Sequence, residues 1–503
     1  MLMPETIREL LNAGADDDVA ITDPASRSRN YRQLRTEVDR LAGQLASIGI
    51  GTSDRVAIVL PNGSEMATTF LAVASCGTSA PLNPAYREDE FRFYLNDINA
   101  RALITIDGDA ESARAAAGQD VQCLTLAGSV GNLTLLHEGT ELDPVDPLRP
   151  SPEEIAMVLH TSGTTSRPKI VPLSQRNMTI SASNIRAHLE LTPEDRCLNV
   201  MPLFHIHGLM AAVLASLEAG GSVACSPGFD AFRFFEWIEK AKPTWFTAVP
   251  TMHQLILSRS RGKEELIKHH PLRFMRSSSA SLPPSVMAEM EDMFNAPLIE
   301  AYGMTEASHQ MASNPLPPEA RKPGSVGRGS NVEIAIMDDA GVLLEQGKTG
   351  EIVIIGDNVT AGYESNPEAN ASAFTDGWFR TGDQGYLDED GYLFLTGRLK
   401  EIINRGGEKI SPREIDEVLL NHDAIEQAVA FAVPHDRLGE DVAVAIVLVE
   451  NSELSEGDVR DYVSTRLVDF KVPRKVIFVD EIPKGPTGKL QRIGLAKQLG
   501  LTE

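Results

Sequence analysis

Ile155-Ala156-Met157-Val158-Leu159-His160 is a short apolar run, and Thr161-Ser162-Gly163-Thr164-Thr165-Ser166-Arg167-Pro168-Lys169 follows it directly. The first run predicts a buried strand. The second is then the loop at its carboxyl end, where open α/β sheets bind ligands. Hydroxyls, a flexible glycine and a lysine suit phosphate oxygens, although a Ser/Thr-rich surface turn is the alternative. Because the loop lacks the Walker pattern, we predict a nucleotide triphosphate loop of another kind.

The sequence before this loop alternates between helix and strand patterns. Apolar residues recur at helical spacing from Leu34 to Ile48, and residues 56–60 form an apolar strand pattern. A second cycle follows, with a helix pattern over 91–98 and a strand pattern over 102–106. This alternation is typical of a parallel sheet covered by helices, so we predict an α/β fold.

Beyond the loop, strand patterns recur at 223–225, 245–249 and 297–301. From about residue 320 they give way to short β segments separated by Gly and Asp turns, such as 333–336 and 351–354. Turns of this kind between short strands favour an antiparallel or barrel-like part.

A domain boundary is expected at Gly397-Arg398-Leu399-Lys400-Glu401. Beyond it, Ser411-Pro412-Arg413-Glu414 predicts a capping box with proline at the first helical position. We therefore expect a large N-terminal domain over 1–396, with two helix-covered sheets and a small β-barrel-like part, a hinge over 397–401, and a small α+β domain over 402–503.

Composition limits the function classes. With 503 residues, 42% apolar and 23% charged, the chain has room for two or more globular domains. A net charge of −25 argues against nucleic acid as the main partner. The four cysteines lack Cys-x-x-Cys spacing, which fits a reducing cytosol. Because the N-terminus lacks a secretory pattern and no apolar run nears about 18 residues, we expect a cytoplasmic protein without membrane insertion; its oligomeric state stays open.

Six ordered motifs span nearly the whole chain. They are His160 to Lys169, Pro202 to Gly208, Ala301 to Glu306, Thr381 to Asp383, Gly397 to Glu401 and Pro483 to Lys489. On these motifs the chain resembles the adenylate-forming superfamily, which comprises acyl-CoA synthetases, nonribosomal-peptide adenylation domains and beetle luciferases. The resemblance implies ATP, Mg²⁺ and CoA as ligands, and a mobile C-terminal domain.

The resemblance also assigns a nucleotide site. Tyr302 offers a face for adenine, while the Thr305 hydroxyl and the Glu306 carboxylate serve a phosphate and its Mg²⁺. Asp383, assisted by Arg398, accepts the ribose hydroxyls. A half-buried aromatic and ordinary turn chemistry are the alternatives for Tyr302 and Asp383. The full expected set is Thr161, Ser162, Gly163, Thr164, Thr165, Lys169, Ser279, Ala280, Glu300, Ala301, Tyr302, Thr305, Asp383 and Arg398.

Three more roles rest on the same resemblance. It makes Lys489 a catalytic residue, with Thr305 and Glu306, because Lys489 bridges the acid carboxylate and the α-phosphate where negative charge builds. It makes Lys400 the hinge, at a position where the family often has aspartate. It also places Arg405, Gly406 and Gly407 along the tunnel for CoA, although Gly-Gly serves a plain β-turn equally well.

Polar residues stand where a fatty acyl tunnel would need apolar ones. His205 and His207 alternate as on one face of an extended segment, and a metal site is a poor alternative because a third ligand at suitable spacing is missing. Donors that converge on a small volume suit a short acid with a second charged end. The expected acid-binding residues are His207, Ser278, Ser279, His309 and His253.

Within the superfamily, the runs 160–169, 276–282 and 404–412 most resemble the oxalate–CoA ligases of plants and fungi. Ile170 replaces the usual glycine and Ser278 the typical cysteine, and neither change removes a donor. The resemblance implies a ligase that converts oxalate, ATP and CoA into oxalyl-CoA, AMP and pyrophosphate through an acyl-adenylate. The alternatives are another small acid such as malonate, a short or medium-chain acid, delivery to a carrier protein, or a catalytically silent nucleotide-binding homologue.

Overall fold

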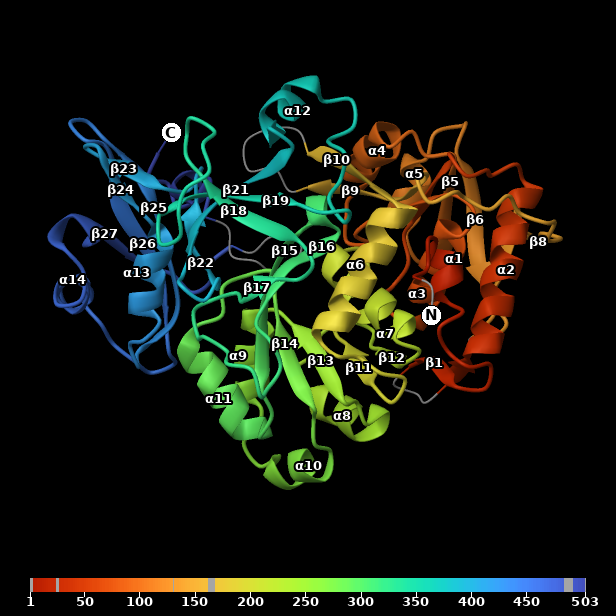
Figure 1. Cartoon of the computed structure of the whole chain (residues 1–503), viewed down its shortest axis with the longest axis horizontal. Coiled ribbons are helices and arrows are strands. Elements are labelled where there is room, and N and C mark those ends of the chain that lie inside the picture. Colours follow the sequence, from red (N-terminus) through yellow and green to blue (C-terminus); the bar gives the residue numbers. More distant parts are fainter. Residues whose placement is uncertain (1–2, 24–26, 130, 162–167, 484–491, 503) are drawn as a thin grey trace.

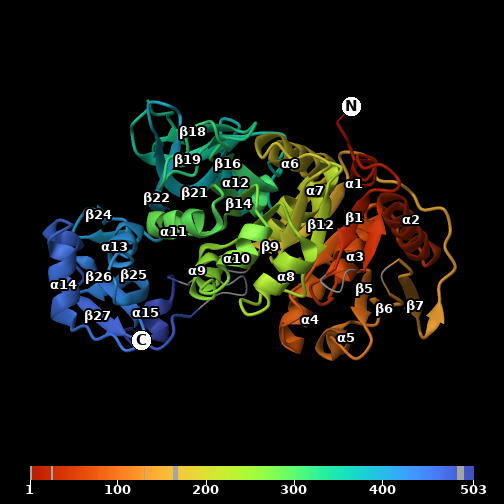
Figure 2. The same cartoon turned by 90° about the horizontal axis from the view of Figure 1, so that it is seen from below.

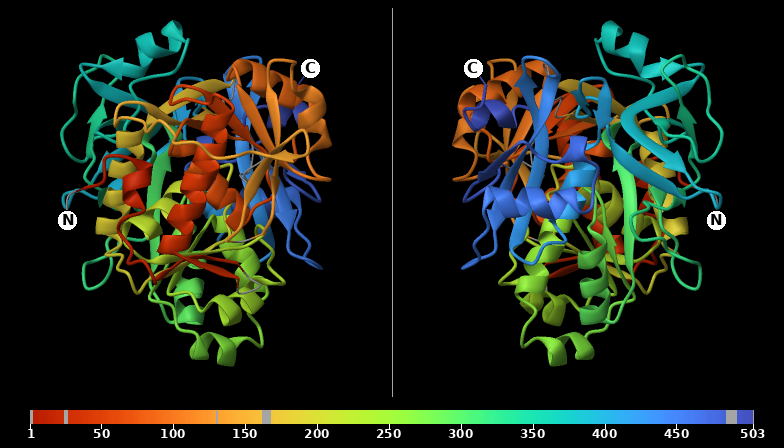
Figure 3. Two further views of the ribbon diagram at one scale, coloured as in Figure 1. Left: turned by 90° about the vertical axis from the view of Figure 1, so that its right-hand side faces the viewer. Right: turned by 90° about the vertical axis from the view of Figure 1, so that its left-hand side faces the viewer.

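The described part of the chain forms four sheets; in Figure 1 the nine-stranded sheet lies near the centre and the eight-stranded sheet at the upper right. The computed structural model describes residues 3–23, 27–129, 131–161, 168–483 and 492–502. The predicted α/β class, with a large N-terminal part and a smaller C-terminal one, is confirmed. Figure 3 shows the C-terminal elements on the side of the molecule opposite the first helices.

The first large sheet has nine strands. Its strands, in spatial order, are β17 (Arg328–Gly329), β16 (His309–Ser313), β15 (Leu298–Met304), β14 (Phe274–Ser277), β13 (Trp245–Ala248), β11 (Arg196–Asn199), β12 (Ser222–Cys225), β1 (Val19–Thr22) and β2 (Ser28–Asn30). The run from β15 to β1 is parallel, whereas β16, β17 and β2 add antiparallel edges. The carboxyl ends of β13, β14 and β15 therefore lie side by side, which gathers their last residues at one edge.

The second large sheet has eight strands. In spatial order they are β10 (Lys169–Ser174), β9 (Ile155–Thr161), β4 (Thr78–Pro81), β3 (Arg55–Ile58), β5 (Ala102–Ile106), β6 (Gln122–Ala127), β7 (Thr134–His137) and β8 (Thr140–Glu141). The strands β9, β4, β3, β5 and β6 are parallel, and β10 returns antiparallel to β9. The predicted strand before the phosphate loop is thus confirmed, and it ends at Thr161.

Helices form three layers around these two sheets. The layer between the sheets consists of α1 (Ile7–Leu10), α2 (Tyr31–Ser47), α3 (Ser64–Ala74), α6 (Gln175–His188), the π-helix η1 (His207–Leu214) and α7 (Ala215–Glu218). The outer layer on the first sheet consists of α8 (Phe234–Ala241), α9 (Pro250–Ser258), α10 (Glu264–His269) and α11 (Pro284–Phe294). The outer layer on the second sheet consists of α4 (Glu88–Asp97) and α5 (Glu111–Ala116). Figure 2 shows α8, α9 and α10 together on one face.

Helix α2 shows how the sequence sets these elements. Asn30 and Gln33 form a capping box that satisfies the first free N–H groups of the helix. Leu34, Val38 and Leu41 follow at helical spacing and are buried in the core between the sheets. The helix ends at Ser47, in agreement with the helical pattern that the sequence shows up to Ile48.

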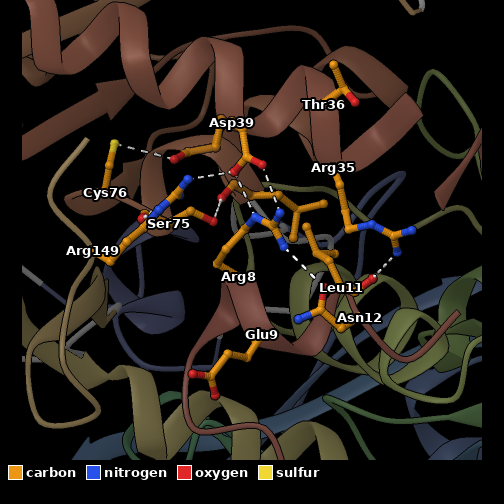
Figure 4. Close-up of polar contacts among 12 residues, drawn as sticks. Arg8, Glu9, Leu11, Asn12, Arg35, Thr36, Asp39, Ser75, Cys76 and Arg149 are labelled. Carbon is orange, nitrogen blue, oxygen red and sulfur yellow. Dashed lines mark hydrogen bonds and ion pairs between the residues drawn. The ribbon is translucent and has the colours of Figure 1, made fainter. Parts of the chain in front are cut away.

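A network of ion pairs fastens the N-terminal segment to α2 (Figure 4). Arg8 donates to both oxygens of Asp39, at 2.7 and 2.8 Å, and Arg149 donates to the same carboxylate at 2.7 Å. Arg35, one turn earlier on α2, donates to the carbonyl of Leu11 at 2.9 Å. Three segments distant in sequence are thereby held together, although each partly exposed pair contributes little alone.

The third sheet is antiparallel, as the short strands and turns predict. It contains β18 (Glu333–Met337), β19 (Gly350–Ile355), β21 (Trp378–Leu387), β20 (Phe374–Thr375) and β22 (Leu393–Arg398), with α12 (Pro367–Ala373) before β20. Backbone hydrogen bonds link Leu393 of β22 to Val326 and Gly327, which precede β17. The small sheet is therefore joined to the antiparallel edge of the first large sheet.

The last sheet belongs to the C-terminal part. It contains β24 (Glu408–Ile410), β23 (Ile403–Arg405), β26 (Gly439–Leu448), β25 (Ile425–His435) and β27 (Lys475–Phe478), with α13 (Pro412–Leu419), α14 (Glu456–Ser464), the 3₁₀ turn η3 (Asp469–Lys471) and α15 (Leu495–Gln498). In the part of the chain that the structure covers, the helices are too short or too polar to span a membrane.

The predicted capping box at the start of α13 is wrong. Ser411 does precede the helix and Pro412 occupies its first turn, but the Ser411 side chain does not cap it. Its hydroxyl instead donates to the carbonyl of Thr396 on β22, and Glu414 accepts from Lys471. A contact across the expected boundary thus competes successfully with the local cap.

Candidate functional site

The two strands that flank the expected phosphate loop, β9 and β10, pair antiparallel. Thr161 ends β9, Lys169 begins β10, and the two are backbone partners across the antiparallel pair. The expected ligands Ser162, Gly163, Thr164 and Thr165 lie outside the described residues. Their roles stay predictions.

Lys169 lies at the base of this loop against an aromatic ring. Its Nζ is 4.2 Å from the centroid of Tyr363, the geometry of a cation–π contact. Burial lowers the pKa of Lys169, the charge of Lys400 lowers it further, and Glu306 opposes both. The expected phosphate-binding lysine and the expected hinge lysine are therefore close enough to repel each other, and an anion between them would relieve that repulsion.

The expected adenosine residues form one hydrogen-bonded chain. Tyr302, on β15, donates its hydroxyl to Asp383 at 2.5 Å. The other oxygen of Asp383 accepts from Arg398 at 2.9 Å across the β21–β22 pair. Burial, followed by the nearby Asp383 charge, raises the pKa of Tyr302. The carboxylate is thus fixed at the hydroxyl end of the Tyr302 ring, which suits contact with a sugar beside a stacked base.

Two acidic residues of the same segment are buried. Glu306, in the 3₁₀ turn η2 (Thr305–Ala307), accepts from the Tyr363 hydroxyl at 2.8 Å, and burial raises its pKa. Glu300 accepts from the peptide N–H of Leu282 at 3.0 Å, and burial raises its pKa to about 7. The second oxygen of Glu300 has no hydrogen-bond partner within the described part of the chain, so one carboxyl oxygen of Glu300 remains available as an acceptor.

Glu306 suits Mg²⁺ only together with phosphates. Within the described ranges no cluster of three or more potential protein ligands occurs. Mg²⁺ usually keeps several waters and binds one or two carboxylates plus substrate phosphates. A single buried Glu306 beside Thr305 fits that pattern and does not fit an all-protein cation cage.

His207 and His309, which were expected to bind the acid, converge on an arginine that the sequence analysis did not assign to the site. Arg276, on β14, is fully buried. Its Nη1 lies 3.2 Å from His207 Nε2 and 3.2 Å from Thr247 Oγ1. Its Nη2 lies 3.1 Å from His309 Nε2 and 2.8 Å from Gln310 Oε1. The two imidazole rings stack with centroids 4.8 Å apart.

Within the described ranges, the charge of Arg276 has no protein counterion. Among the described residues, no carboxylate pairs with it, and its Nε has no hydrogen-bond partner. Burial lowers its pKa to about 9, so it still carries a proton at neutral pH. A buried cation without an anion is costly, and such a group is typical of a site that an anionic ligand completes.

Two residues of this cluster have an unusual backbone conformation. Ser279 and His309 both have positive φ, 73° and 96°, which is unusual for residues other than glycine. Ser279 Oγ lies 3.1 Å from His207 Nδ1. Gly303 lets the His309 backbone approach closely, because any Cβ at Gly303 would overlap the His309 carbonyl oxygen. Strain of this kind is common at ligand sites.

Not every expected acid-binding residue joins the cluster. Ser278 is buried and donates to the Ala301 carbonyl at 2.9 Å, whereas Ala280, which was expected at the nucleotide, is exposed. His253 lies on α9, with its ring 5.6 Å from Phe246. Phe246 packs with the outer helices, whereas its neighbour Thr247 points to Arg276 on the other face of the sheet. Burial lowers the pKa of His253 to about 4, which suits a neutral packing residue.

The extended segment expected around His205 and His207 is wrong. His207 begins the π-helix η1, and the His207 N–H donates to His205 Nδ1 at 3.2 Å. The two rings therefore do not share one strand face. His207 reaches the cluster because the helix begins there and directs its ring toward β13 and β14, with Nε2 2.6 Å from Thr247 Oγ1.

The C-terminal candidates lie around two turns. Lys400 is in the exposed turn after β22, where the Glu401 and Ile402 N–H groups donate to the Arg398 carbonyl. Gly406 and Gly407 both have positive φ and form the turn between β23 and β24, while Arg405 donates to Asp441 at 2.7 Å. Lys489 lies outside the described residues.

Four functional candidates escaped the sequence analysis. Arg276, Thr247, Gln310 and Tyr363 all contact expected site residues. The sequence does contain a clue to Arg276, because it is the one charged residue within the strand pattern Phe274-Met275-Arg276-Ser277. The others carry no signal in the sequence alone, since only the tertiary fold brings them to the cluster.

Comparison with known proteins agrees with this site. Residues 11–364 match the family model described as AMP-binding enzyme, and residues 414–489 match that of the AMP-binding enzyme C-terminal domain. The chain is 48% identical to a probable CoA ligase, CCL9, of Humulus lupulus, covering 92% of this chain and 90% of that protein. It is 45% identical to an oxalate–CoA ligase of Arabidopsis thaliana, covering 92% of each.

A solved structure supports the same relationship. Crystalline ATP-bound MatB from Rhodopseudomonas palustris superposes with a TM-score of 0.89 at 30% identity, covering 97% of each chain. The two family models together span most of the sequence, and they include Lys169, Tyr302 and Arg276. The chain therefore belongs to the family of AMP-binding enzymes.

Proposed function

We propose that this protein is an ATP-dependent acid–CoA ligase whose acid is a small dicarboxylate, most specifically oxalate. The observation that carries the proposal is Arg276, a fully buried cation held only by neutral groups among the described residues. A second carboxylate on the acid would supply the missing charge, whereas a fatty acid would bury its chain against an unpaired guanidinium. The kinship with an oxalate–CoA ligase supports the same acid.

The reaction has two halves. In the first, one carboxylate oxygen of the acid attacks the α-phosphorus of ATP, pyrophosphate leaves, and a mixed anhydride with AMP forms. In the second, the CoA thiol attacks the acyl carbon, AMP leaves, and the thioester forms. The first half concentrates negative charge on the phosphate oxygens, so positioned cations are the main contribution that a protein can make to it.

Each group of residues has a task in this scheme. Tyr302 and Asp383 hold the adenosine, and Lys169 holds the terminal phosphates. Glu306 and Thr305 would hold Mg²⁺, which neutralises phosphate charge when it is bound. Lys489, by resemblance, bridges the acid and the α-phosphate. His207, Ser279, His309 and Arg276 hold the distal carboxylate at the opposite end.

The second half needs a different arrangement of the C-terminal part. We propose that residues 397–401 form the hinge between domains 1–396 and 402–503, with Lys400 at its centre. The turn at Lys400 is exposed, which suits a change of backbone dihedrals there. The rotation would bring Arg405, Gly406 and Gly407 to the pantetheine arm of CoA.

A panel of acids tests the proposal. Pyrophosphate release and thioester formation are measured with oxalate, malonate, acetate and hexanoate, each with saturating ATP, Mg²⁺ and free CoA. Oxalate is expected to give the highest kcat/KM. A preference for malonate would retain the ligase and correct the acid; adenylation without thioester would indicate a carrier protein as acceptor; and inactivity with every acid would indicate a silent homologue.

A further inference from the structure

Gln310 lies directly behind the cation that the proposed substrate would meet. It is fully buried on β16, next to His309. Its Oε1 lies 2.8 Å from Arg276 Nη2, and its Nε2 lies 3.0 Å from the Ser330 hydroxyl. Because arginine can only donate, the amide oxygen must face Arg276, and the amide nitrogen must then donate to Ser330. Both ends of the Gln310 amide are thereby fixed.

Among the described residues, the other groups that contact Arg276 are a hydroxyl and two imidazole nitrogens, and none is a carboxylate. Thr247 Oγ1 accepts from Nη1, and the Nε2 atoms of His207 and His309 face guanidinium nitrogens at 3.2 and 3.1 Å. A ring nitrogen that accepts from arginine carries no proton of its own. These contacts orient the guanidinium plane without cancelling its charge.

Gln310 is the position where a counterion would fit most easily. Glutamate has nearly the same shape as glutamine, and a carboxylate 2.8 Å from Nη2 would form a buried ion pair with Arg276. The fold would tolerate that pair, but the substrate would then meet a neutral pair instead of a cation. An amide at residue 310 therefore leaves the charge for the ligand.

We propose that Gln310 is a positioning residue that sets the selectivity for a second carboxylate, because its neutral amide orients Arg276 and leaves its charge uncompensated until the acid binds. This inference rests on the proposed function, since it concerns the distal end of the same acid. Gln310 touches Arg276 and not the reacting atoms, so its effect is on binding of the acid and not on the chemistry at phosphorus.

The test compares selectivity among substitutions at residue 310. The kcat/KM for oxalate and for acetate is measured by pyrophosphate release for the wild type, Gln310→Glu and Gln310→Met. We expect Gln310→Glu to lower the oxalate-to-acetate ratio by roughly 10² or more, mainly through the KM for oxalate, because the new carboxylate both pairs Arg276 and repels the substrate. Gln310→Met introduces no carboxylate beside Arg276, so the oxalate-to-acetate ratio of this variant should stay within about tenfold of the wild-type ratio.

A carboxylate introduced at another buried glutamine provides the matched control. Gln175 is also fully buried, with its amide bound to Ile7 and Ala74, and it lies on α6 away from Arg276. Gln175→Glu should reduce thermal stability without changing the oxalate-to-acetate ratio. If the oxalate-to-acetate ratio falls as much in Gln175→Glu as in Gln310→Glu, the inference is overturned, because the loss of selectivity would then come from a general loss of stability.

A milder variant covers the case in which Gln310→Glu does not fold. Ser330→Ala removes the group that holds the amide nitrogen, so the KM for oxalate should rise several-fold while kcat/KM for acetate stays the same. Equal losses for both acids would show a merely structural role and overturn the inference. If the wild type itself has no preference for oxalate, the proposed function fails; if the wild type prefers oxalate and Gln310→Glu keeps that preference, only the role of Gln310 fails.

Discussion

Replacing Arg276 with methionine would remove the one buried charge on which the acid specificity depends. Methionine keeps an unbranched stem of similar length, so the cavity left in the cluster is small. In the wild type the distal carboxylate would bind a guanidinium that no protein carboxylate neutralises among the described residues. Loss of one partner from such a buried charge pair costs about 2–5 kcal/mol, which corresponds to a decrease of roughly 30-fold to 5,000-fold in kcat/KM for oxalate. Acetate has no second carboxylate, so its kcat/KM should not fall.

The assay is pyrophosphate release with saturating ATP and CoA, over a range of oxalate or acetate concentrations. The matched control is Arg273→Met, three residues earlier, where a partly exposed arginine pairs with Asp195 outside the cluster. That variant should keep the wild-type ratio of oxalate to acetate. The reasoning is refuted if Arg276→Met remains folded, judged by an unchanged circular dichroism spectrum, and yet retains that ratio within about threefold.

Three further predictions concern the nucleotide site, the hinge and pH. Lys489→Ala should slow adenylation by roughly 10² or more while presynthesised acyl-AMP still reacts with CoA, because one preorganised charge is lost only from the first half; equal loss in both halves would contradict the assignment. Lys400→Pro should reduce thioester formation far more than pyrophosphate exchange, since proline fixes a dihedral at the hinge, and equal reductions would make Lys400 structural. The carboxyl of Glu300 has a folded pKa of about 7 against 4.5, so its protonated form favours the fold below pH 4.5 and that stability is lost as pH rises to about 7. Relative to Glu300→Gln, the wild type should therefore lose about 3 kcal/mol across that window, and a pH-independent difference in Tm between the two would show that Glu300 titrates normally.

The fold could be predicted in outline because its patterns are local. Helix α2 has its cap and its apolar stripe in contiguous sequence, and the strands around residues 56, 102 and 245 are short apolar runs. What the sequence could not supply was the pairing of these strands into two sheets, which depends on contacts between distant segments. The failed cap at Ser411 has the same cause, since its hydroxyl finds a partner on β22 instead of on its own helix.

The proposed nucleotide site rests on a different kind of sequence signal. Its residues occur in compact motifs, and the structure brings Tyr302, Asp383 and Arg398 into one hydrogen-bonded chain. At the proposed acid-binding end, the sequence indicated the two histidines but not the arginine. His207 and His309 were chosen because polar residues are out of place in an acyl tunnel, but Arg276 stands in an apolar strand and is recognisable only once the fold shows that no described carboxylate neutralises it.

The most direct measurement of the central claim is the ratio of kcat/KM for oxalate to that for acetate in the wild-type enzyme, with saturating ATP, Mg²⁺ and free CoA. Buried donors left unpaired by the smaller acid can cost discrimination on the order of 10⁴. We expect a ratio of that order, with oxalyl-CoA, AMP and pyrophosphate formed in equal amounts. Acetate or hexanoate used as well as oxalate would contradict it, and Arg276 with its two histidines would then be a packing cluster instead of the site for a second carboxylate.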